Sequence, residues 1–208
     1  MVAVGIQGVS LTPFYYHGLY VPDGSATHPA VITDTALVFA LQSLFHGSDW
    51  RSPRPTPDYQ ADLAAIPWRA SLLMGEGNFI TAPVRHTVDM SREGGFTERI
   101  QHNMGSGNYK NTFFVHEVAP GARYEGVLVG PDPFQALETD EIIVRVGVGR
   151  QGMLALSKVQ RVDAVRLNTA TGKLFGSRCS AQYRIMDTIR PSWLLPVEEA
   201  VEELERWR

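Results

Sequence analysis

The sequence IIVRVGVGRQGMLALSKVQRV, at residues 142–162, decides the fold that we expect. Its first five residues are apolar except for Arg145, which predicts a buried strand. Gly147, Gly149 and Gly152 follow, and glycines gathered in this way indicate a loop. The apolar residues after them predict a second strand, so the stretch predicts two strands joined by a glycine-rich loop.

Basic and amide side chains surround this loop. Glycines let a backbone approach a phosphate closely, and neighbouring bases add charge-assisted hydrogen bonds. The loop has neither the spacing of a Walker phosphate loop nor the helix that follows a dinucleotide-binding fingerprint. We therefore predict contact with a nucleic acid, and a hairpin turn with exposed bases is the alternative. The residues expected to make this contact are Arg145, Gly147, Gly149, Arg150, Gln151, Lys158 and Arg161.

The N-terminal part of the chain predicts a strand and then a helix. Apolar residues alternate with small or polar ones over residues 2–6, as in a half-buried strand. The aromatic segment FYYHGLY follows at residues 14–20. Helical spacing of apolar residues then predicts a helix that begins near Thr33 and ends at Gly47.

The C-terminal part predicts two further strands, at residues 153–168 and 180–186, and a helix that begins at Pro196. The chain contains no series of alternating strands and helices. It therefore favours an α+β fold with an antiparallel sheet, and we expect residues 1–208 to form a single domain.

Residues 83–130 predict an insertion rich in β-hairpins, with two extended arms and a polar tip that contains glycines. Single-stranded RNA is commonly held by aromatic stacking together with amide and basic groups. An exposed surface loop without a ligand is the alternative. The residues of the tip that we expect to contact RNA are His102, Asn103, Tyr109 and Lys110.

The charge of the chain is unevenly distributed. The net charge is −3, yet residues 142–190 hold nine basic and two acidic side chains, a local charge of +7. Residues 1–50 contain no lysine or arginine. A cationic region balanced elsewhere is typical of a local site for a polyanion.

Several classes of protein are disfavoured by the composition. No apolar run approaches the roughly 20 residues that span a bilayer, and the N-terminus lacks the pattern of a secretory signal. Cys179 is the only cysteine, which excludes an intrachain disulfide and suits a reducing compartment. We expect a cytoplasmic protein without a membrane partner.

The six histidines show none of the spacings of a metal site or a known catalytic motif. His17 or His102 could act as the base of an RNA endonuclease, but we find no convincing constellation of acid and base. We therefore predict no catalytic residues, no metal and no cofactor.

Two segments together resemble one family, the smaller RAMP subunits of Cascade-like CRISPR complexes in the type IV and type I-D branch. In that family a tyrosine-rich strand precedes a helix with the pattern N/D-x-A-L-x-x-A-L. A later segment has the pattern R-(L/V)-G followed by S-K. The matching residues here are Asp34, Ala36, Leu37, Ala40, Leu41, Arg145, Val146, Gly147, Ser157 and Lys158.

This resemblance implies a ferredoxin-like core with an inserted β-hairpin thumb, for which residues 83–130 are the candidate. It also implies a subunit that caps the 5′ handle of the crRNA. Some relatives in other CRISPR branches cleave precursor RNA, but the residues here show no convincing Tyr/His/Lys triad, so we expect a non-catalytic subunit. The implied partners are crRNA, the backbone subunits and a large subunit, with target DNA as a further candidate. The alternatives are a metal-independent CRISPR RNA endoribonuclease and a protein-binding scaffold without nucleic acid.

Overall fold

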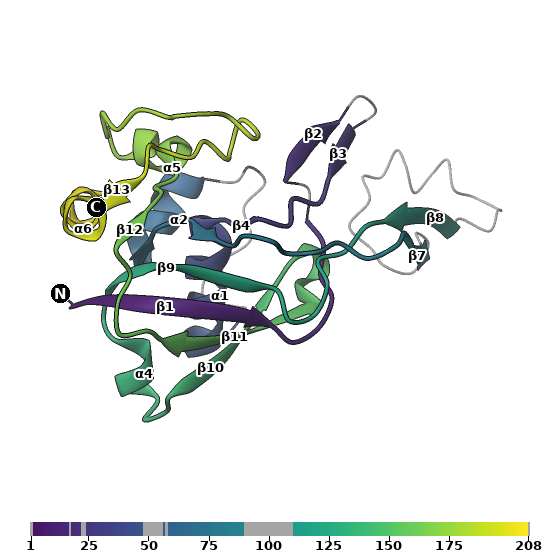
Figure 1. Ribbon diagram of the computed structural model, residues 1–208, viewed down its shortest axis with the longest axis horizontal. Helices are drawn as coiled ribbons and strands as arrows, with labels where there is room; N and C mark the ends of the chain where they lie inside the picture. Colours follow the sequence, from purple (N-terminus) through teal and green to yellow (C-terminus); the bar gives the residue numbers. More distant parts are fainter. Residues whose placement is uncertain are drawn as a thin grey trace.

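The computed structural model describes residues 2–16, 18–21, 24–47, 56, 58–89 and 110–207. A seven-stranded sheet forms the centre of this part of the chain, and every pair of neighbouring strands is antiparallel (Figure 1). The strands of the sheet are β10 (Glu141–Val146), β11 (Gly152–Lys158), β1 (Val2–Ser10), β9 (Arg123–Gly130), β6 (Leu73–Met74), β4 (Val31–Ile32) and β5 (Arg69–Ala70). Their order across the sheet is β10-β11-β1-β9-β6-β4, and β5 also pairs with β9.

The order of the central strands is that of a ferredoxin-like fold. β1 lies between β9 and β11, and β9 in turn pairs with β5 and β6, which follow the first helix in the chain. The connection from β9 to β10 contains only the short helix α4 (Pro133–Ala136), where a ferredoxin-like fold usually has its second long helix. The predicted α+β fold with a ferredoxin-like antiparallel sheet is therefore confirmed.

Helix α1 (Asp34–His46) covers one face of the sheet, behind it in Figure 1. The hydroxyl of Thr33 caps the helix by accepting a hydrogen bond of 3.2 Å from the backbone N–H of Ala36. Gly47 ends it with a φ of 73°, a conformation that favours glycine. The buried side chains Leu37, Val38 and Leu41 pack on the sheet, as the helical spacing predicts.

Strand β9 contributes to a core on each of its two faces. Tyr124 and Leu128 belong to the core beneath α1. Val127 and Val129 point to the opposite face, where they pack with Trp207 and the C-terminal helix α6 (Val197–Glu205). This alternation is what a strand buried on both faces requires. The expected helix after Pro196 is thus present.

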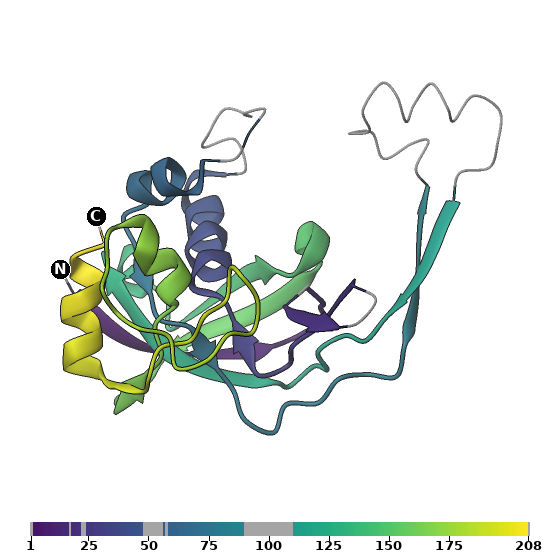
Figure 2. The same ribbon diagram turned by 90° about the horizontal axis from the view of Figure 1, so that it is seen from above.

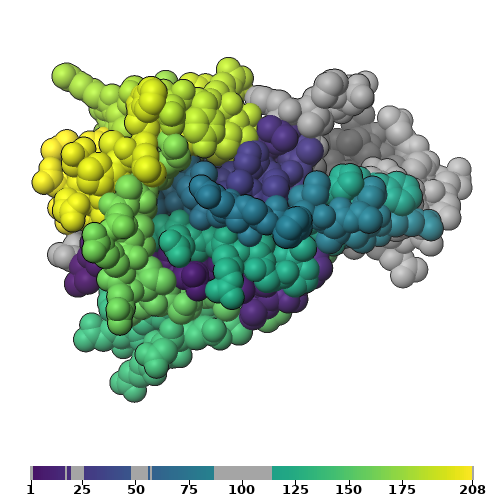
Figure 3. Space-filling model, viewed as in Figure 1, coloured from purple at the N-terminus to yellow at the C-terminus, as the bar shows by residue number. Residues whose placement is uncertain are grey.

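The segment between β11 and α6 differs from the two strands expected there. Only β11 and the short β12 (Ala164–Val165) are strands within residues 153–168, and β12 pairs with β13 (Leu195–Pro196). Residues 180–186 form isolated bridges instead of a strand, and the helix α5 (Thr169–Leu174) lies between them and β12. In the space-filling view, this yellow-green part covers the upper left of the molecule (Figure 3).

A β-hairpin extends away from the body of the molecule (Figure 2). Its strands are β7 (Val84–Asp89) and β8 (Lys110–Val115), which pair along their whole length. A smaller hairpin, β2 (Leu19–Val21) with β3 (Gly24–Ala26), lies near its base. The projecting hairpin is shorter than the insertion expected at residues 83–130, because β9 is a central strand of the sheet.

The remaining helix of the described residues, α2 (Tyr59–Ala65), lies next to α1 (Figure 2). None of the described helices is long and apolar enough to cross a membrane.

Candidate functional site

The glycine-rich loop between β10 and β11 is a short 3₁₀ turn, Val148–Arg150. Gly147, Gly149 and Arg150 have φ values of 81°, 66° and 54°. This left-handed conformation is unfavourable for arginine, and strain of this kind persists only where the surrounding structure imposes it. The turn presents Gly149, Arg150 and Gln151 to solvent.

Gly147 and Gly152 have a packing role, which the sequence did not suggest. A Cβ atom at Gly147 would lie 2.9 Å from the carbonyl oxygen of Tyr15. A Cβ atom at Gly152 would lie 2.4 Å from the Cβ of Phe14. Both glycines thus allow the aromatic segment to pack on the loop, and the N–H of Val148 donates to the Tyr15 carbonyl at 2.8 Å. Gly149 has open space around it except for Gln151, so it is the glycine of the loop that a ligand can approach.

The aromatic segment connects this loop to the base of the hairpin. The backbone of Phe14 exchanges two hydrogen bonds with Val118, at 2.7 and 3.4 Å. The ring of Tyr15 lies 5.0 Å from the ring of His86 on β7. The loop, the aromatic segment and the hairpin base are therefore held together, as Figure 1 shows at the right-hand end of the sheet.

Tyr15, His86 and Glu117 form a cluster at the hairpin base that sequence reasoning missed. His86 Nε2 lies 3.0 Å from Glu117 Oε1, an arrangement in which a carboxylate orients an imidazole. Burial, and secondarily the negative charge of Glu117, raise the pKa of the Tyr15 phenol. Tyr15 is therefore held as a neutral phenol. Tyr15 and His86 are 71 positions apart in the sequence, and His86 and Glu117 are 31 apart. Only the fold brings them together, so no sequence spacing indicates the cluster.

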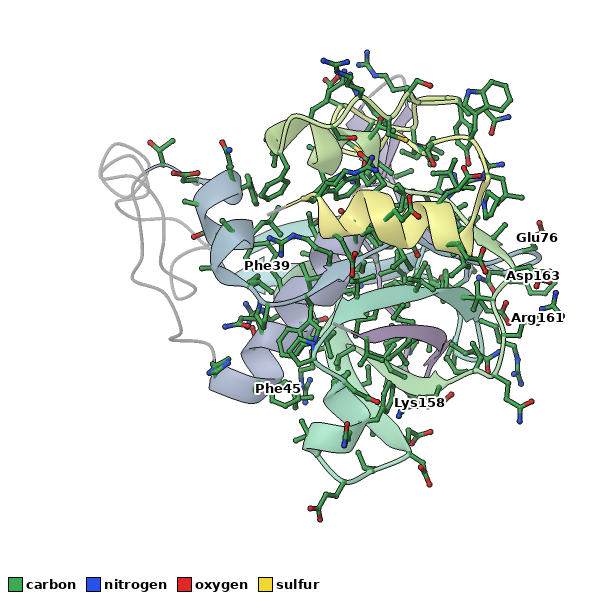
Figure 4. The ribbon with its side chains drawn as sticks, turned by 90° about the vertical axis from the view of Figure 1, so that its left-hand side faces the viewer. Phe39, Phe45, Glu76, Lys158, Arg161 and Asp163 are labelled. Atoms are coloured by element: carbon green, nitrogen blue, oxygen red, sulfur yellow. The ribbon has the colours of Figure 1, made fainter. Side chains whose placement is uncertain are left out.

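Lys158 and Arg161 lie at the other end of β11, away from the loop. The seven residues of β11 span about 20 Å at about 3.4 Å per residue, so the strand separates them from Arg150. Figure 4, which views the molecule from the left-hand side of Figure 1, labels Lys158 and Arg161, whereas the hairpin projects at the right-hand side of Figure 1. The structure therefore does not gather all the predicted basic residues into one cluster.

Both of these distant bases have acidic partners. Lys158 Nζ is 2.7 Å from Asp132 Oδ2 and lies over the ring of Phe134. Arg161 Nε is 2.5 Å from Asp163 Oδ1. The Arg161–Asp163 pair is exposed and contributes only about 0–1 kcal/mol, so a polyanion could replace Asp163. The side chain of Asp132 is only 12% exposed, so the pair with Lys158 is more protected.

The other predicted residues fall into two groups. Arg145 is exposed on β10, opposite Met153 of β11, on the face of the sheet away from α1. Lys110 begins β8, where its backbone pairs with Asp89. His102, Asn103 and Tyr109 lie outside the described residues, as does His17. Their assignments remain predictions.

Within the described part of the chain, no three His, Cys, Asp or Glu side chains lie close enough together to hold a metal ion.

Comparison with known proteins finds similarity to solved structures alone. No family model matches the chain, and no curated protein matches it either. A chain of the structure described as "Cryo-EM structure of the Type III-B Cmr-beta bound to cognate target RNA and AMPPnP, state 1" aligns with 76% of this chain, with 11% identity and a TM-score of 0.41. The match covers 64% of that chain, which is less than two thirds of its length.

Proposed function

We propose that this chain is a non-catalytic RNA-binding subunit of a multisubunit CRISPR effector complex, and that it caps the 5′ handle of the guide RNA. In this role it would contact the backbone subunits and a large subunit, with target DNA as a further candidate partner. The proposal starts from the resemblance of two sequence segments to the smaller RAMP subunits. The similar structure comes from a complex bound to RNA, but its likeness is too weak to carry the proposal.

The observation that carries the proposal is the exposed turn at Gly149 and Arg150 beside the base of a projecting hairpin. The turn places an arginine and an open backbone where a strand of RNA could lie against them. Arginine binds phosphate through a planar fork and stacks on bases. A ligand at this turn would also be next to the hairpin, and the sequence between the two strands of the hairpin contains the predicted residues His102, Asn103 and Tyr109.

The two family-like segments have distinct places in this architecture. Asp34, in the first segment, is fully buried at the start of α1 and accepts a hydrogen bond of 2.9 Å from Asn168. The second segment begins at Arg145 on β10 and ends at Lys158 on β11. The first therefore supports the fold, whereas the second frames the exposed turn.

Purification with the products of neighbouring genes tests the proposal. We expect the complex to retain a single RNA species with a common 5′ end, because a cap recognises one end of the guide. The measurement is the absorbance ratio at 260 and 280 nm followed by sequencing of the bound RNA. Purification without RNA would favour a protein-binding scaffold, and exposed Trp193 and Leu194 would then be its candidate contact surface.

An RNA endonuclease is the second candidate, because the cluster of Tyr15, His86 and Glu117 contains a base oriented by a carboxylate. Against it, Tyr15 and Glu117 are buried, and the raised pKa of Tyr15 keeps it from acting as a base at neutral pH.

We expect the purified protein to leave a repeat-containing transcript intact, with or without divalent metal. The measurement is gel electrophoresis after prolonged incubation. A cleavage product that disappears in His86→Ala, and not in the exposed-residue control His116→Ala, would establish the endonuclease instead. Parallel variants at His17 and His102 test the two bases that the sequence suggested.

A further inference from the structure

A cavity of about 520 Å³ opens between the helices and the glycine-rich loop. Helices α1, α2 and α5 stand together on one side of the sheet and form three of its walls (Figure 2). The fourth wall is the end of β10 with the first residues of the loop, and residues 187–189 close the rim. Most of its lining is apolar, with Phe14, Tyr16 and Tyr59 as its aromatic residues.

This cavity shares a wall with the exposed turn. Val146, Gly147 and Val148 line the cavity, and Gly149 and Arg150 follow directly. The N–H of Arg150 donates to the carbonyl of Gly147 at 3.1 Å, so the turn folds back onto the cavity wall. A nucleic-acid strand that lies along the turn therefore passes the opening of the cavity.

Two arginines pair with a carboxylate that lines the cavity. Asp187 lines the cavity, and its Oδ1 lies 2.9 Å from Arg184 Nη2 and 3.0 Å from Arg190 Nη2. Two guanidinium groups therefore surround one carboxylate. Arg184 is largely exposed, so a phosphate can approach it without the loss of a buried ion pair.

The interior suits a flat aromatic group with a polar edge. The rings of Phe14 and Tyr16 are stacked, with centroids 6.0 Å apart, and the Tyr16 hydroxyl already donates to the carbonyl of His28. Tyr59 lines the cavity and is 56% exposed. Hydroxyl groups at the lining positions can meet the edge of a base, and they belong to Thr33, Thr35, Thr171 and Thr188.

We propose that this cavity holds one unstacked nucleobase of the RNA whose backbone lies along the Gly149–Arg150 turn, with Tyr59 stacking on that base. Recognition of single-stranded RNA commonly uses splayed bases that stack on aromatic rings and make polar contacts along their edges. The inference rests on the proposed function, because it needs RNA at the turn. It adds a binding pocket, and it adds Tyr59 as a residue that contacts the base.

A scan with abasic RNA tests the proposal. The RNA recovered from the complex is resynthesised with a single abasic nucleotide at each position in turn, and the affinity of the full-length protein is measured for each. We expect one position at which the loss of the base weakens binding about tenfold, as the removal of one base–aromatic stack would do. Tyr59→Ala should weaken binding of the intact RNA by a similar factor and have no further effect on the RNA that is abasic at this position.

Two control variants separate stacking from other effects. Tyr59→Phe keeps the ring and should bind like the wild type, whereas Tyr183→Ala removes another exposed ring and should leave the scan unchanged. A scan without a sensitive position, or one whose sensitive position is unaffected by Tyr59→Ala, would overturn the pocket and leave RNA binding intact. Failure of the protein to bind any RNA would overturn the proposed function as well. Equal competition by free nucleoside monophosphates would show a site for free nucleotides and would contradict the assignment to RNA.

Discussion

A variant that lacks residues 100–111, with the gap closed by glycines, is expected to remain folded and to lose assembly with the backbone subunits. The segment contains His102, Asn103, Tyr109 and Lys110, which are the tip residues predicted to contact RNA. All members of the described hydrophobic clusters lie outside residues 100–111, so the deletion leaves each of them in place. Its effect should therefore fall on the ligand and the partners rather than on the fold.

Thermal unfolding and co-purification measure the two halves of this prediction. We expect the midpoint of unfolding to match that of the wild type, and the backbone subunits to be absent from the purified variant. Tyr109→Ala is the single-residue counterpart, and it should weaken RNA retention ten- to a hundredfold if the ring stacks on a base. A deletion variant that recovers all its partners would show that the hairpin is not part of the interface. A large drop in the unfolding midpoint would place the segment in the core.

Local patterns in the sequence predicted those parts of the fold that depend on neighbouring residues. The helix from Asp34 to His46 follows from the spacing of its apolar residues, the cap at Thr33 and the glycine at its end. The two strands around the glycine-rich loop follow in the same way from continuous apolar runs. Such signals act within a few residues, so a single sequence displays them.

The parts that were mispredicted depend on packing between distant segments. Residues 180–186 contain apolar residues at strand-like spacing, but Ile185 packs with Val31 and Leu72 at the edge of the sheet. Asn168 begins helix α5 and also donates hydrogen bonds to Asp34 and to the carbonyl of Thr188. These contacts fix the local conformation, and no pattern within the segment encodes them.

The sequence predicted only part of the candidate site, because the rest of the site also depends on packing between distant segments. The sequence located the glycine-rich loop, but it could not show that Gly147 and Gly152 serve the packing of Phe14 and Tyr15. Nor could it show that the length of β11 takes Lys158 to the opposite end of the sheet. A glycine next to an arginine has the same appearance in a sequence whether it faces a ligand or another part of the chain.

Charge reversal at Arg150 is expected to weaken binding of the guide RNA ten- to a hundredfold. Arg150 is exposed at the end of the 3₁₀ turn, where it is the basic side chain nearest in sequence to the open Gly149. A hydrogen bond to a charged group contributes about 1.5–3 kcal/mol, and about 1.4 kcal/mol corresponds to a factor of ten. Substitution by glutamate also introduces repulsion between its carboxylate and the RNA phosphates, so the loss of affinity should be at least tenfold.

Two further variants make the comparison specific. Arg206→Glu, at the C-cap of α6, changes the charge by the same amount at a site that we do not assign to RNA. It breaks the pair between the exposed Arg206 and the mostly buried Glu203, and we expect no more than a small change in RNA affinity. Arg161→Glu tests whether the RNA extends along the sheet to the far end of β11. A loss in this variant would lengthen the binding surface, whereas wild-type affinity would confine it to the loop and the hairpin.

The salt dependence of RNA binding by wild type, Arg150→Glu and Arg206→Glu measures whether Arg150 contacts a phosphate of the RNA. Each phosphate contact on single-stranded RNA contributes about 0.7 to the slope of log affinity against log salt concentration. We expect the slope to become shallower by about 0.7 or more in Arg150→Glu and to stay unchanged in Arg206→Glu. Equal slopes and equal affinities in all three proteins would contradict the assignment of the glycine-rich turn as an RNA-binding site.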